Sequence, residues 1–400
     1  MTESPQPPPE DTPTVSQSLQ GWFGSKLGGL VAPLAAAFLA FLVGAVLILA
    51  AGHNPFSAYK AIFDGTGLNP FSYFGDGFDG AWTDLQQTLI IFTPLVCTAI
   101  AVAFAFRCGM FNIGGQGQYL VGIYASLFIG TRMAGLPDGL HIVLAIVAAI
   151  LVGALWGGIA GLLKASVGAH EVITTIMLNW IAIYGGQWLF ELGGPLQGSE
   201  KSIPKSDAVL EAVRLPTFGT GLQPVHIGVF IAIAALVVYS VLLNRTTLGF
   251  EVRAVGFNPD AARYSGISVG RNYFLALAIA GGFAGLGGAL DNLGWKFTLA
   301  TNDIQVSTVG FIGIAVALLG RNTAVGIFFS ALLFAALQTG TSSRQIDASI
   351  FPPELAGNLS TMIQALIILF VATELLIVYI WAARKKIGIS GVKALRQGEN

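Results

Sequence analysis

The sequence predicts an all-α protein that crosses a membrane many times. Of its 400 residues, 54% are apolar and only 10% are charged, whereas a soluble domain carries about 25% charged residues. The chain also contains 51 glycines, the residue that lets membrane helices approach one another closely. Its formal net charge of -1 leaves no excess of positive charge for nucleic acid. We therefore expect a polytopic membrane protein surrounded by lipid, with no nucleic-acid partner.

Residues 1–32 are predicted to form a disordered, proline-rich cytoplasmic tail. Prolines at positions 5, 7, 8, 9 and 13 stand among Ser, Thr, Gln and acidic residues, a composition that cannot bury enough apolar surface to offset the cost of ordering. The tail lacks the basic region and cleavage site of a signal peptide. The apolar run Pro33–Ala51 is therefore expected to remain as the first transmembrane helix.

Nine further apolar runs approach or exceed the length needed to span about 30 Å of hydrocarbon. They are Thr88–Phe106, Gln118–Leu136, Leu140–Leu163, Val172–Phe190, Val225–Leu243, Phe274–Trp295, Ser307–Leu319, Ala324–Thr341 and Leu359–Trp381. The run Ser307–Leu319 is short, so it is either a half-helix or a helix that begins near Asp303. We therefore expect about ten transmembrane helices, with nine as the alternative, and broken or re-entrant segments among them.

The basic residues predict that both termini are cytoplasmic. In that orientation, 13 of the 20 basic residues face the cytoplasm, as the positive-inside rule requires. They are Lys26, Arg107, Lys164, Arg245, Arg253, Arg263, Arg271, Arg321, Arg384, Lys385, Lys386, Lys393 and Arg396. The domain organisation that follows is a membrane domain over residues 33–382, with a cytoplasmic connection at 244–273, and a basic cytoplasmic tail over 383–400.

The chain is not expected to be an enzyme or to bind a metal or cofactor. Its four histidines and two cysteines are too scattered to form a metal site, and no HExxH helix or pair of facing aspartates is present. Transport, the default task of so many helices, needs an energy source. Because the chain has neither a GxxxxGKS nor a GxxxxGKT loop to hold a nucleotide phosphate, any ATP would be bound by a partner protein.

The longest cytoplasmic connection, residues 244–273, carries a sharply bounded helix. Asn258 is a good N-cap, Pro259 suits the first helical position, Asp260 favours the positive end of the helix dipole, and Gly266 suits the C-terminal stop. These signals predict a two-turn helix over Pro259–Ser265. A helix this short must lie against the protein or a partner to be stable. It is therefore either a mechanical contact or a capped loop that only closes the connection.

Polar residues within the apolar runs are candidates for function because they are costly inside a bilayer. Glu171, Thr175 and Asn179 occur four residues apart and share one helix face, with Thr174 beside them. This face is expected to look into the protein; the alternative is that Thr and Asn bond neighbouring helices while Glu171 lies at the cytoplasmic interface. The acids Asp291 and Glu374 stand near predicted helix ends, where we expect water to reach them.

The segment Arg107–Gln118 is polar and glycine-rich, yet it lies directly between two spans. This pattern is compatible with a broken or re-entrant stretch that lines a cavity, although hydropathy alone predicts a cytoplasmic turn. The side chains of Phe111, Asn112, Gln116 and Gln118 could offer a stacking surface and amide hydrogen bonds to a sugar or a base.

Three segments closely resemble one transporter family. The sequence EVRAVGFNPDAARYSGI at 251–267 is similar to the coupling segment of membrane subunits of ABC importers for simple sugars and nucleosides, a superfamily that includes branched-chain amino acid permeases. The sequence FRCGMFNIGGQGQ at 106–118 resembles the family signature after the second helix. The sequence EVITTIMLN at 171–179 resembles the opening of the fifth helix and is most similar to the nucleoside branch. At Gln116 we would expect many relatives to carry Glu, so no role that needs a negative charge is carried over.

The resemblance implies a type II-like ABC importer permease in a bacterial cell membrane. Such a subunit would receive nucleosides from an extracytoplasmic binding lipoprotein, pair with a second permease, expected to be a different chain, and be driven by separate ABC ATPase subunits that bind ATP. The alternatives are a simple-sugar permease of the ribose or galactose type and an ion-coupled secondary transporter. The resemblance covers residues 85–345 and leaves the tail and the loop 52–87 without a role.

Two sets of residues follow from the motifs and the resemblance. The residues expected to couple the chain to the ATPase are Glu251, Arg253, Gly256, Asn258, Pro259, Arg263 and Tyr264. The residues expected along the substrate pathway are Phe111, Asn112, Gln116, Gln118, Glu171, Thr174, Thr175 and Asn179.

Overall fold

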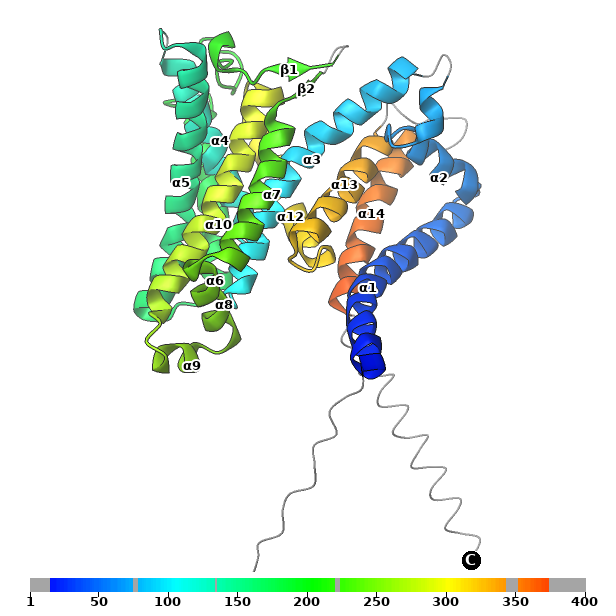
Figure 1. Cartoon of the computed structure of the whole chain (residues 1–400). Coiled ribbons are helices and arrows are strands. Elements are labelled where there is room, and N and C mark those ends of the chain that lie inside the picture. Colours follow the sequence, from blue (N-terminus) through cyan, green and yellow to red (C-terminus); the bar gives the residue numbers. More distant parts are fainter. Residues whose placement is uncertain (1–14, 75–77, 134, 220–223, 343–351, 374–400) are drawn as a thin grey trace, which may run out of the picture.

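The computed structural model describes residues 15–74, 78–133, 135–219, 224–342 and 352–373. These residues are nearly all helical, and their only strands form one short antiparallel hairpin (Figure 1). Its strands are β1 (Thr217–Phe218) and β2 (Val225–His226), in which Thr217 pairs with His226 and Phe218 with Val225. The hairpin lies at the opposite end of the molecule from helix α9 (Figure 1).

Most helices follow one another along the chain with short connections, whereas the long connection between α6 and α7 contains η3 and the hairpin. In order they are α1 (Val15–Ala50), α2 (Pro55–Asp64), η1 (Pro70–Tyr73), α3 (Phe78–Arg107), α4 (Gly115–Arg132), α5 (Asp138–Val167), α6 (Glu171–Phe190), η3 (Glu211–Val213), α7 (Gly228–Arg245), α8 (Thr247–Phe257), α9 (Pro259–Tyr264), α10 (Val269–Asp291), η4 (Asn292–Lys296), α11 (Thr301–Val306), α12 (Val309–Leu319), α13 (Ala324–Gly340) and α14 (Pro353–Ala372). Of these, η4 is a single π-helical turn, and η1 and η3 are 3-10 turns.

The predicted all-α polytopic membrane fold is confirmed, because every predicted run contains a helix. Within the described residues, six helical stretches are long and apolar enough to cross a membrane: Pro33–Ala50, Phe78–Arg107, Gly139–Val167, Gly228–Arg245, Val269–Lys296 and Thr301–Leu319. The remaining four runs correspond to α4 and α6, which carry more polar residues, and to α13 and α14, whose apolar parts are shorter. The number of ten spans stays a prediction.

Helix α1 differs from its predicted extent. It begins at Val15 and so includes residues 15–32, which the composition predicted to be part of a disordered tail. The sequence offers a physical reason, since Leu19, Trp22, Phe23, Leu27 and Leu30 recur at the three- and four-residue spacing of a helix face. Residues 1–14 of the predicted tail, the end of the last predicted run at 374–381 and the basic tail at 383–400 lie outside the described residues.

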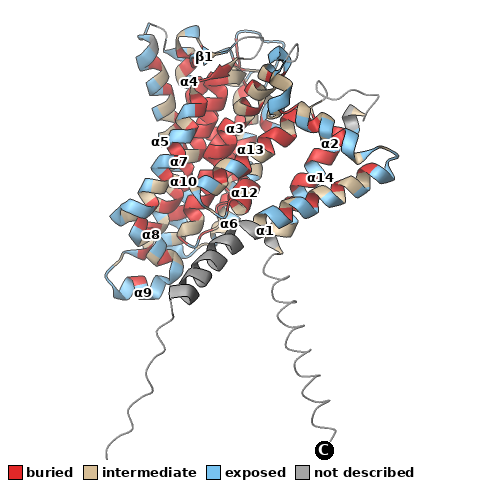
Figure 2. Ribbon diagram, turned by 45° about the vertical axis from the view of Figure 1, so that its right-hand side comes forward, coloured by how far each residue is buried: buried red, intermediate tan, exposed pale blue. Residues whose placement is uncertain are grey.

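Helix α3 forms the centre of the molecule and joins two groups of helices (Figure 1). It packs against α10 and α7 on one side and against α12 and α13 on the other, while α1 packs against α14. Of the apolar window in α3, 83% is buried, compared with 22% in α1. Figure 2 shows the same contrast between the buried α3 and the more exposed α1. The exposed apolar side chains of α1 suit contact with lipid.

Glycine faces hold α5 and α10 together. A Cβ placed on Gly153 would collide with the backbone of Gly281, and one placed on Gly157 would collide with that of Leu277. On its other side α10 meets α4 in the same way, because Gly285 stands against Gly122. The three helices therefore pack backbone to backbone, and α4 is fixed relative to α10.

The eighth predicted run, Ser307–Leu319, is the second part of a broken helix. Helix α11 ends at Val306 and α12 begins at Val309, so Ser307 and Thr308 interrupt the stretch Thr301–Leu319. The connection between α3 and α4 is likewise irregular, and it is buried at Cys108, Met110, Asn112 and Gly114. The segment is therefore an irregular stretch packed inside the protein; whether it is re-entrant or a cytoplasmic turn stays a prediction.

Candidate functional site

The irregular segment between α3 and α4 is fastened by a reciprocal pair of amides. Asn112 Nδ2 donates to Gln118 Oε1 at 2.9 Å, and Gln118 Nε2 donates to Asn112 Oδ1 at 3.1 Å. Both side chains are buried. Because Gln118 belongs to the first turn of α4 and Asn112 precedes that helix, the pair fixes the direction in which the chain enters α4.

Gln116 joins the start of α4 to the break between α11 and α12. Its Oε1 accepts a hydrogen bond from Gly310 N at 2.8 Å, and its Nε2 donates to Ser307 O at 3.0 Å. One amide therefore satisfies a donor from the start of α12 and an acceptor left free by the break. A carboxylate could only accept, so the neutral Gln116 fits this position and a negative charge there is not required.

Asn179 of α6 binds the same segment from another side. Its Oδ1 accepts from Gly117 N at 2.7 Å, and its Nδ2 donates to Ile113 O at 2.9 Å. Thr175, one turn earlier, is buried and donates to Glu171 O at 2.7 Å within its own helix. The face that carries Thr175 and Asn179 therefore looks into the protein, as predicted. Asn179 hydrogen-bonds the backbone of the neighbouring segment, and Thr175 bonds the backbone of its own helix.

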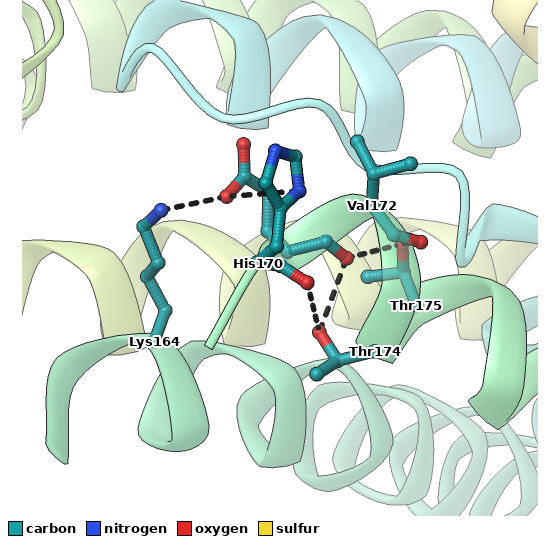
Figure 3. Close-up of polar contacts among 6 residues, drawn as sticks. Lys164, His170, Val172, Thr174 and Thr175 are labelled. Atoms are coloured by element: carbon teal, nitrogen blue, oxygen red, sulfur yellow. Dashed lines mark hydrogen bonds and ion pairs between the residues drawn. The ribbon is translucent and has the colours of Figure 1, made fainter. Parts of the chain in front are cut away.

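Glu171 begins α6 just before the apolar run 172–190 and pairs with the end of α5. Its Oε2 lies 2.8 Å from Lys164 Nζ and 4.0 Å from His170 Nδ1, in the group drawn in Figure 3. Burial, the largest single influence, would raise the pKa of the Glu171 carboxyl, but the hydrogen bonds from Lys164 and from the backbone, together with the charges of Lys164 and His170, outweigh it and hold this pKa below its usual value. Thr174 donates to His170 O and Glu171 O (Figure 3). The position of Glu171 at the cytoplasmic interface stays a prediction.

Phe111 completes the predicted pathway set, and it packs edge-on against Phe106 with ring centroids 4.9 Å apart. The structure therefore brings Phe111, Asn112, Gln116, Gln118, Thr175 and Asn179 together around one segment, with Glu171 and Thr174 at the start of α6. Their amide groups bond protein partners and tie α4, α6 and the broken helix into one unit. Contact of these residues with a substrate stays a prediction.

The coupling segment forms the short capped helix that the sequence predicts. Asn258 Oδ1 accepts from the backbone N–H groups of Asp260 and Ala261, at 3.0 Å each, and Pro259 occupies the first turn of α9. After α9, Gly266 adopts a φ of +82°, in the left-handed region, and its N–H bonds Arg263 O. These features end the helix as predicted.

The predicted coupling residues divide into an outward and an inward group. Arg253, Arg263 and Tyr264 are exposed, and Tyr264 is 94% exposed. Glu251 instead turns inward, where its Oε2 accepts from Asn272 Nδ2 at 3.0 Å. Sequence reasoning left out Phe257, which is 95% exposed at the end of α8; it lies within the motif 251–267, but the sequence does not show which side chains of that motif face outward.

Gly256 connects this segment to the turn that follows α3. A Cβ on Gly256 would collide with the backbone of Arg107 and Cys108. The Arg107 side chain continues the contact, because its Nη2 donates to Asn322 O at 2.7 Å in the turn between α12 and α13. Tyr239 Oη donates to the same carbonyl, also at 2.7 Å. The coupling segment is therefore linked to the irregular segment and to the C-terminal end of α12.

The model of one protein family matches residues 85–372, which is most of the chain. That family is described as "Branched-chain amino acid transport system / permease component". The chain belongs to this permease family. The resemblance found in the sequence motifs at 106–118, 171–179 and 251–267 is thereby confirmed.

Several characterised permeases are similar to this one over most of their length. The guanosine ABC transporter permease protein NupP of Bacillus subtilis is 40% identical over 76% of this chain and 84% of its own. The nucleoside ABC transporter permease protein NupB of Lactococcus lactis is 36% identical over 73% and 80%. The glucose ABC transporter permease protein TsgB13 of Haloferax volcanii is 35% identical over 72% and 76%. The permease is thus related to transport components of ABC systems.

The permease also has an uncovered face that the motifs did not indicate. On α6, Met177, Trp180 and Tyr184 are exposed, and the Trp180 and Tyr184 rings stack with centroids 5.7 Å apart. Helix α11 packs beside α6, and Gln305 and Thr308 at its end are exposed. Aromatic rings and polar side chains therefore lie on adjoining surfaces of α6 and the broken helix.

One expectation about acids in the permease is wrong. Asp291 was expected near a helix end with access to water, but it is 5% exposed and its Oδ2 lies 2.7 Å from Lys296 Nζ. Tyr119 Oη also donates to Asp291. The partner, Lys296, was a basic residue in the sequence without a spacing motif, so only the fold reveals the pair. Glu374 lies outside the described residues.

Proposed function

We propose that this chain is a permease subunit that moves nucleosides inward across a bacterial cell membrane as part of an ABC importer. The observation that carries the substrate is the identity of 40% and 36% to permeases named for guanosine and for nucleosides, over 76% and 73% of the chain. The nucleoside-like form of the segment 171–179 agrees with it.

ATP is bound by separate ATPase subunits, and this chain holds no cofactor of its own. The surface proposed to meet them is made by exposed residues of α8 and α9: Arg253, Phe257, Arg263 and Tyr264. Two aromatic rings, Phe257 at the end of α8 and Tyr264 at the end of α9, are almost fully exposed within the described chain. Large exposed apolar groups of this kind mark interaction sites.

Motion of the coupling segment would reach the centre of the permease through close contacts. Gly256 presses on the turn at Arg107 and Cys108, and the same irregular segment leads to Gln116, which holds both sides of the break at Ser307 and Gly310. A break in a helix is a natural hinge because its backbone is not held by the regular helical ladder. ATP binding on the partner would therefore act on α11 and α12.

The substrate pathway is proposed to run along the uncovered face of α6 and the broken helix. Trp180 and Tyr184 offer flat rings on which a base can stack, and Gln305 and Thr308 offer polar groups. A second permease subunit is proposed to cover this face, so that the pore lies between two chains. We expect that chain to differ from this one.

The proposed topology has ten spans with both termini in the cytoplasm. It places α8 and α9 inside, facing the ATPase, and the β1–β2 hairpin outside, where a substrate-binding lipoprotein would dock. The two features lie at opposite ends of the molecule (Figure 1), which supports this arrangement.

A simple-sugar permease is the second candidate, favoured by the 35% identity to a permease named for glucose. An ion-coupled secondary transporter receives less support, because its expected signature is a functional acid within the membrane. The buried acid that the described chain does contain, Asp291, is neutralised by Lys296 at 2.7 Å.

The deciding experiment is uptake of labelled guanosine, uridine, ribose and glucose by cells that express the full importer. We expect uptake of both nucleosides and little of either sugar. An importer whose ATPase subunit carries a substituted phosphate-binding lysine serves as the control and is expected to be inactive. Uptake of sugar without nucleoside would reject the nucleoside substrate and leave the permease assignment in place.

A further inference from the structure

A pocket opens at the end of α10 that is remote from α9, close to the β1–β2 hairpin (Figure 1). It has a volume of about 520 Å³ and is lined by Thr217, Trp295, Lys296, Phe297, Thr298 and Asp303, among others. Small-molecule sites commonly have volumes of about 300–1,000 Å³ and combine apolar walls with a few polar groups. This pocket has the volume of such a site and the same combination of apolar and polar lining residues.

The wall formed by Trp295 and Lys296 belongs to the π-helical turn η4. Such turns inside or beside α-helices are rare and frequently occur at functional sites. Both residues also line a second cavity, of about 120 Å³, together with Asp291, Val309 and Gln338. The π-helical turn therefore separates an outer pocket from an inner cavity that reaches the first residue of α12.

Polar groups at this wall and in the inner cavity still have hydrogen-bond donors that a ligand could use. Lys296 Nζ carries three N–H donors; one is directed to Asp291 Oδ2 at 2.7 Å and one to Tyr119 Oη at 3.1 Å. Its charge is balanced by Asp291, so the site favours a neutral ligand over an anion. Deeper inside, Gln338 Nε2 is buried and has no hydrogen-bond partner among the described residues.

The rim of the pocket is held in place from two sides. The Arg214 guanidinium lies 4.8 Å from the centre of the Phe297 ring, and Phe297 has a φ of 56°, a left-handed conformation that a non-glycine residue adopts only when its surroundings hold it. Gly294 lies against the imidazole of His226, where a Cβ would collide with the ring. The π-helical turn is thus placed by the hairpin and by the segment before it.

We propose that this outer pocket is the first site on the permease for a nucleoside released outside, with the base against Trp295 and the sugar hydroxyls near Lys296, Thr298 and Asp303. The inference rests on the proposed nucleoside substrate. A nucleoside is neutral, has a flat aromatic face and carries several hydroxyl groups, and this combination matches an indole, a charge-balanced lysine and exposed oxygen atoms. Neither the family motifs nor the predicted pathway residues include this pocket.

The test compares uptake of labelled guanosine and uridine by the full importer, reconstituted with its ATPase and binding lipoprotein, in wild type, Trp295→Ala and Trp295→Phe. We expect Trp295→Ala to slow guanosine uptake about tenfold and uridine uptake less, because the larger purine loses more stacking. Trp295→Phe is expected to keep most of both activities. Phe71→Ala, which alters another exposed aromatic on the outer side, is the matched control and is expected to behave like wild type.

A photolabelling experiment gives a second, direct readout. Irradiation of the wild-type importer with 8-azidoadenosine is expected to label the segment 291–303, and Trp295→Ala is expected to reduce that labelling. Unchanged uptake of both nucleosides in Trp295→Ala, or labelling absent from this segment, would overturn the proposal while leaving nucleoside import intact.

Two other results would also contradict it. Equal slowing of both nucleosides together with weaker docking of the unloaded lipoprotein would mean that the pocket receives a protein side chain. Failure of the wild type to import any nucleoside would reject the proposed function, and this site with it.

Discussion

Gly256 of the coupling segment lies directly against Gly109 in the turn after α3. A Cβ placed on Gly109 would be only 3.3 Å from the Gly256 Cα, and Gly109 has a φ of +74° that a residue with a side chain rarely adopts. The contact joins the surface proposed for the ATPase to the segment that holds the broken helix. A small change at this contact should therefore uncouple the surface proposed for the ATPase from the broken helix.

Gly256→Val is predicted to abolish nucleoside uptake while the permease still assembles with its ATPase. The added side chain must push α8 away from Arg107 and Cys108, so the transmitted movement is lost. Uptake and ATPase activity of the purified complex are the measurements. Gly357→Ala is the control, because a Cβ there meets no atom within 4 Å. Normal uptake with Gly256→Val would contradict this role of the contact.

Gln116 is predicted to stabilise the break between α11 and α12 through its neutral amide. Gln116→Leu removes both hydrogen bonds, to Gly310 N and Ser307 O, and leaves two buried groups without partners at a cost of about 1–3 kcal/mol each. Gln116→Glu keeps an acceptor for Gly310 N but loses the donor to Ser307 O. Melting temperatures in detergent should fall in both variants; unchanged melting in Gln116→Leu would show that the break is held by other contacts.

Arg253→Glu is predicted to abolish transport-linked ATP hydrolysis and to leave the membrane fold intact. Arg253 is exposed on α8, so the reversed charge acts on the partner surface and not on packing. The readouts are expression, melting temperature and stimulated ATPase activity. Arg245→Glu, at another exposed arginine on the end of α7, is the matched control. Full stimulation of hydrolysis in Arg253→Glu would remove this residue from the coupling surface.

Asn258→Ala is predicted to weaken the same surface by a different route. It deletes the cap that accepts from Asp260 N and Ala261 N, which costs about 1 kcal/mol of local helix stability. We expect partial loss of transport, measured as a reduced maximal uptake rate, with Asn258→Asp retaining it because aspartate also caps. Equal uptake by Asn258→Ala and Asn258→Asp would argue against a need for the folded α9.

The predicted orientation can be read from single cysteines at Ser202 and Ser268, two exposed positions, in a background without Cys97 and Cys108. A membrane-impermeant thiol reagent added to intact cells should label position 202 and spare position 268. Labelling of position 268 from outside, or of both positions equally, would contradict the topology with cytoplasmic termini.

The sequence predicted the parts of the fold that rest on local patterns. Runs of apolar residues located the helices, and the Asn258–Pro259 signal located α9, because capping is decided by neighbours within one turn. The family motifs were read correctly for the same reason, since each is a short contiguous string.

Contacts between distant segments could not be read in this way. Gln116 meets Gly310 only after the helices have packed, and a one-dimensional pattern does not contain the distance between them. Asp291 and Lys296 are only five residues apart, but their contact depends on the π-helical turn η4, which no sequence pattern indicated. The burial of Asp291 was also not predictable from its position, because an acid near the end of an apolar run is equally typical of the membrane interface. The outer pocket and the exposed Phe257 were missed because each depends on which faces the fold leaves uncovered.

The central claim is that ATP hydrolysis on a partner drives nucleosides through this permease by way of α8 and α9. The most direct measurement is accumulation of labelled guanosine in proteoliposomes that contain the complete importer, with and without ATP on the ATPase side, for wild type and Arg253→Glu. We predict ATP-dependent accumulation in the wild type alone. Accumulation that needs no ATP, or that is equal in Arg253→Glu, would contradict the account.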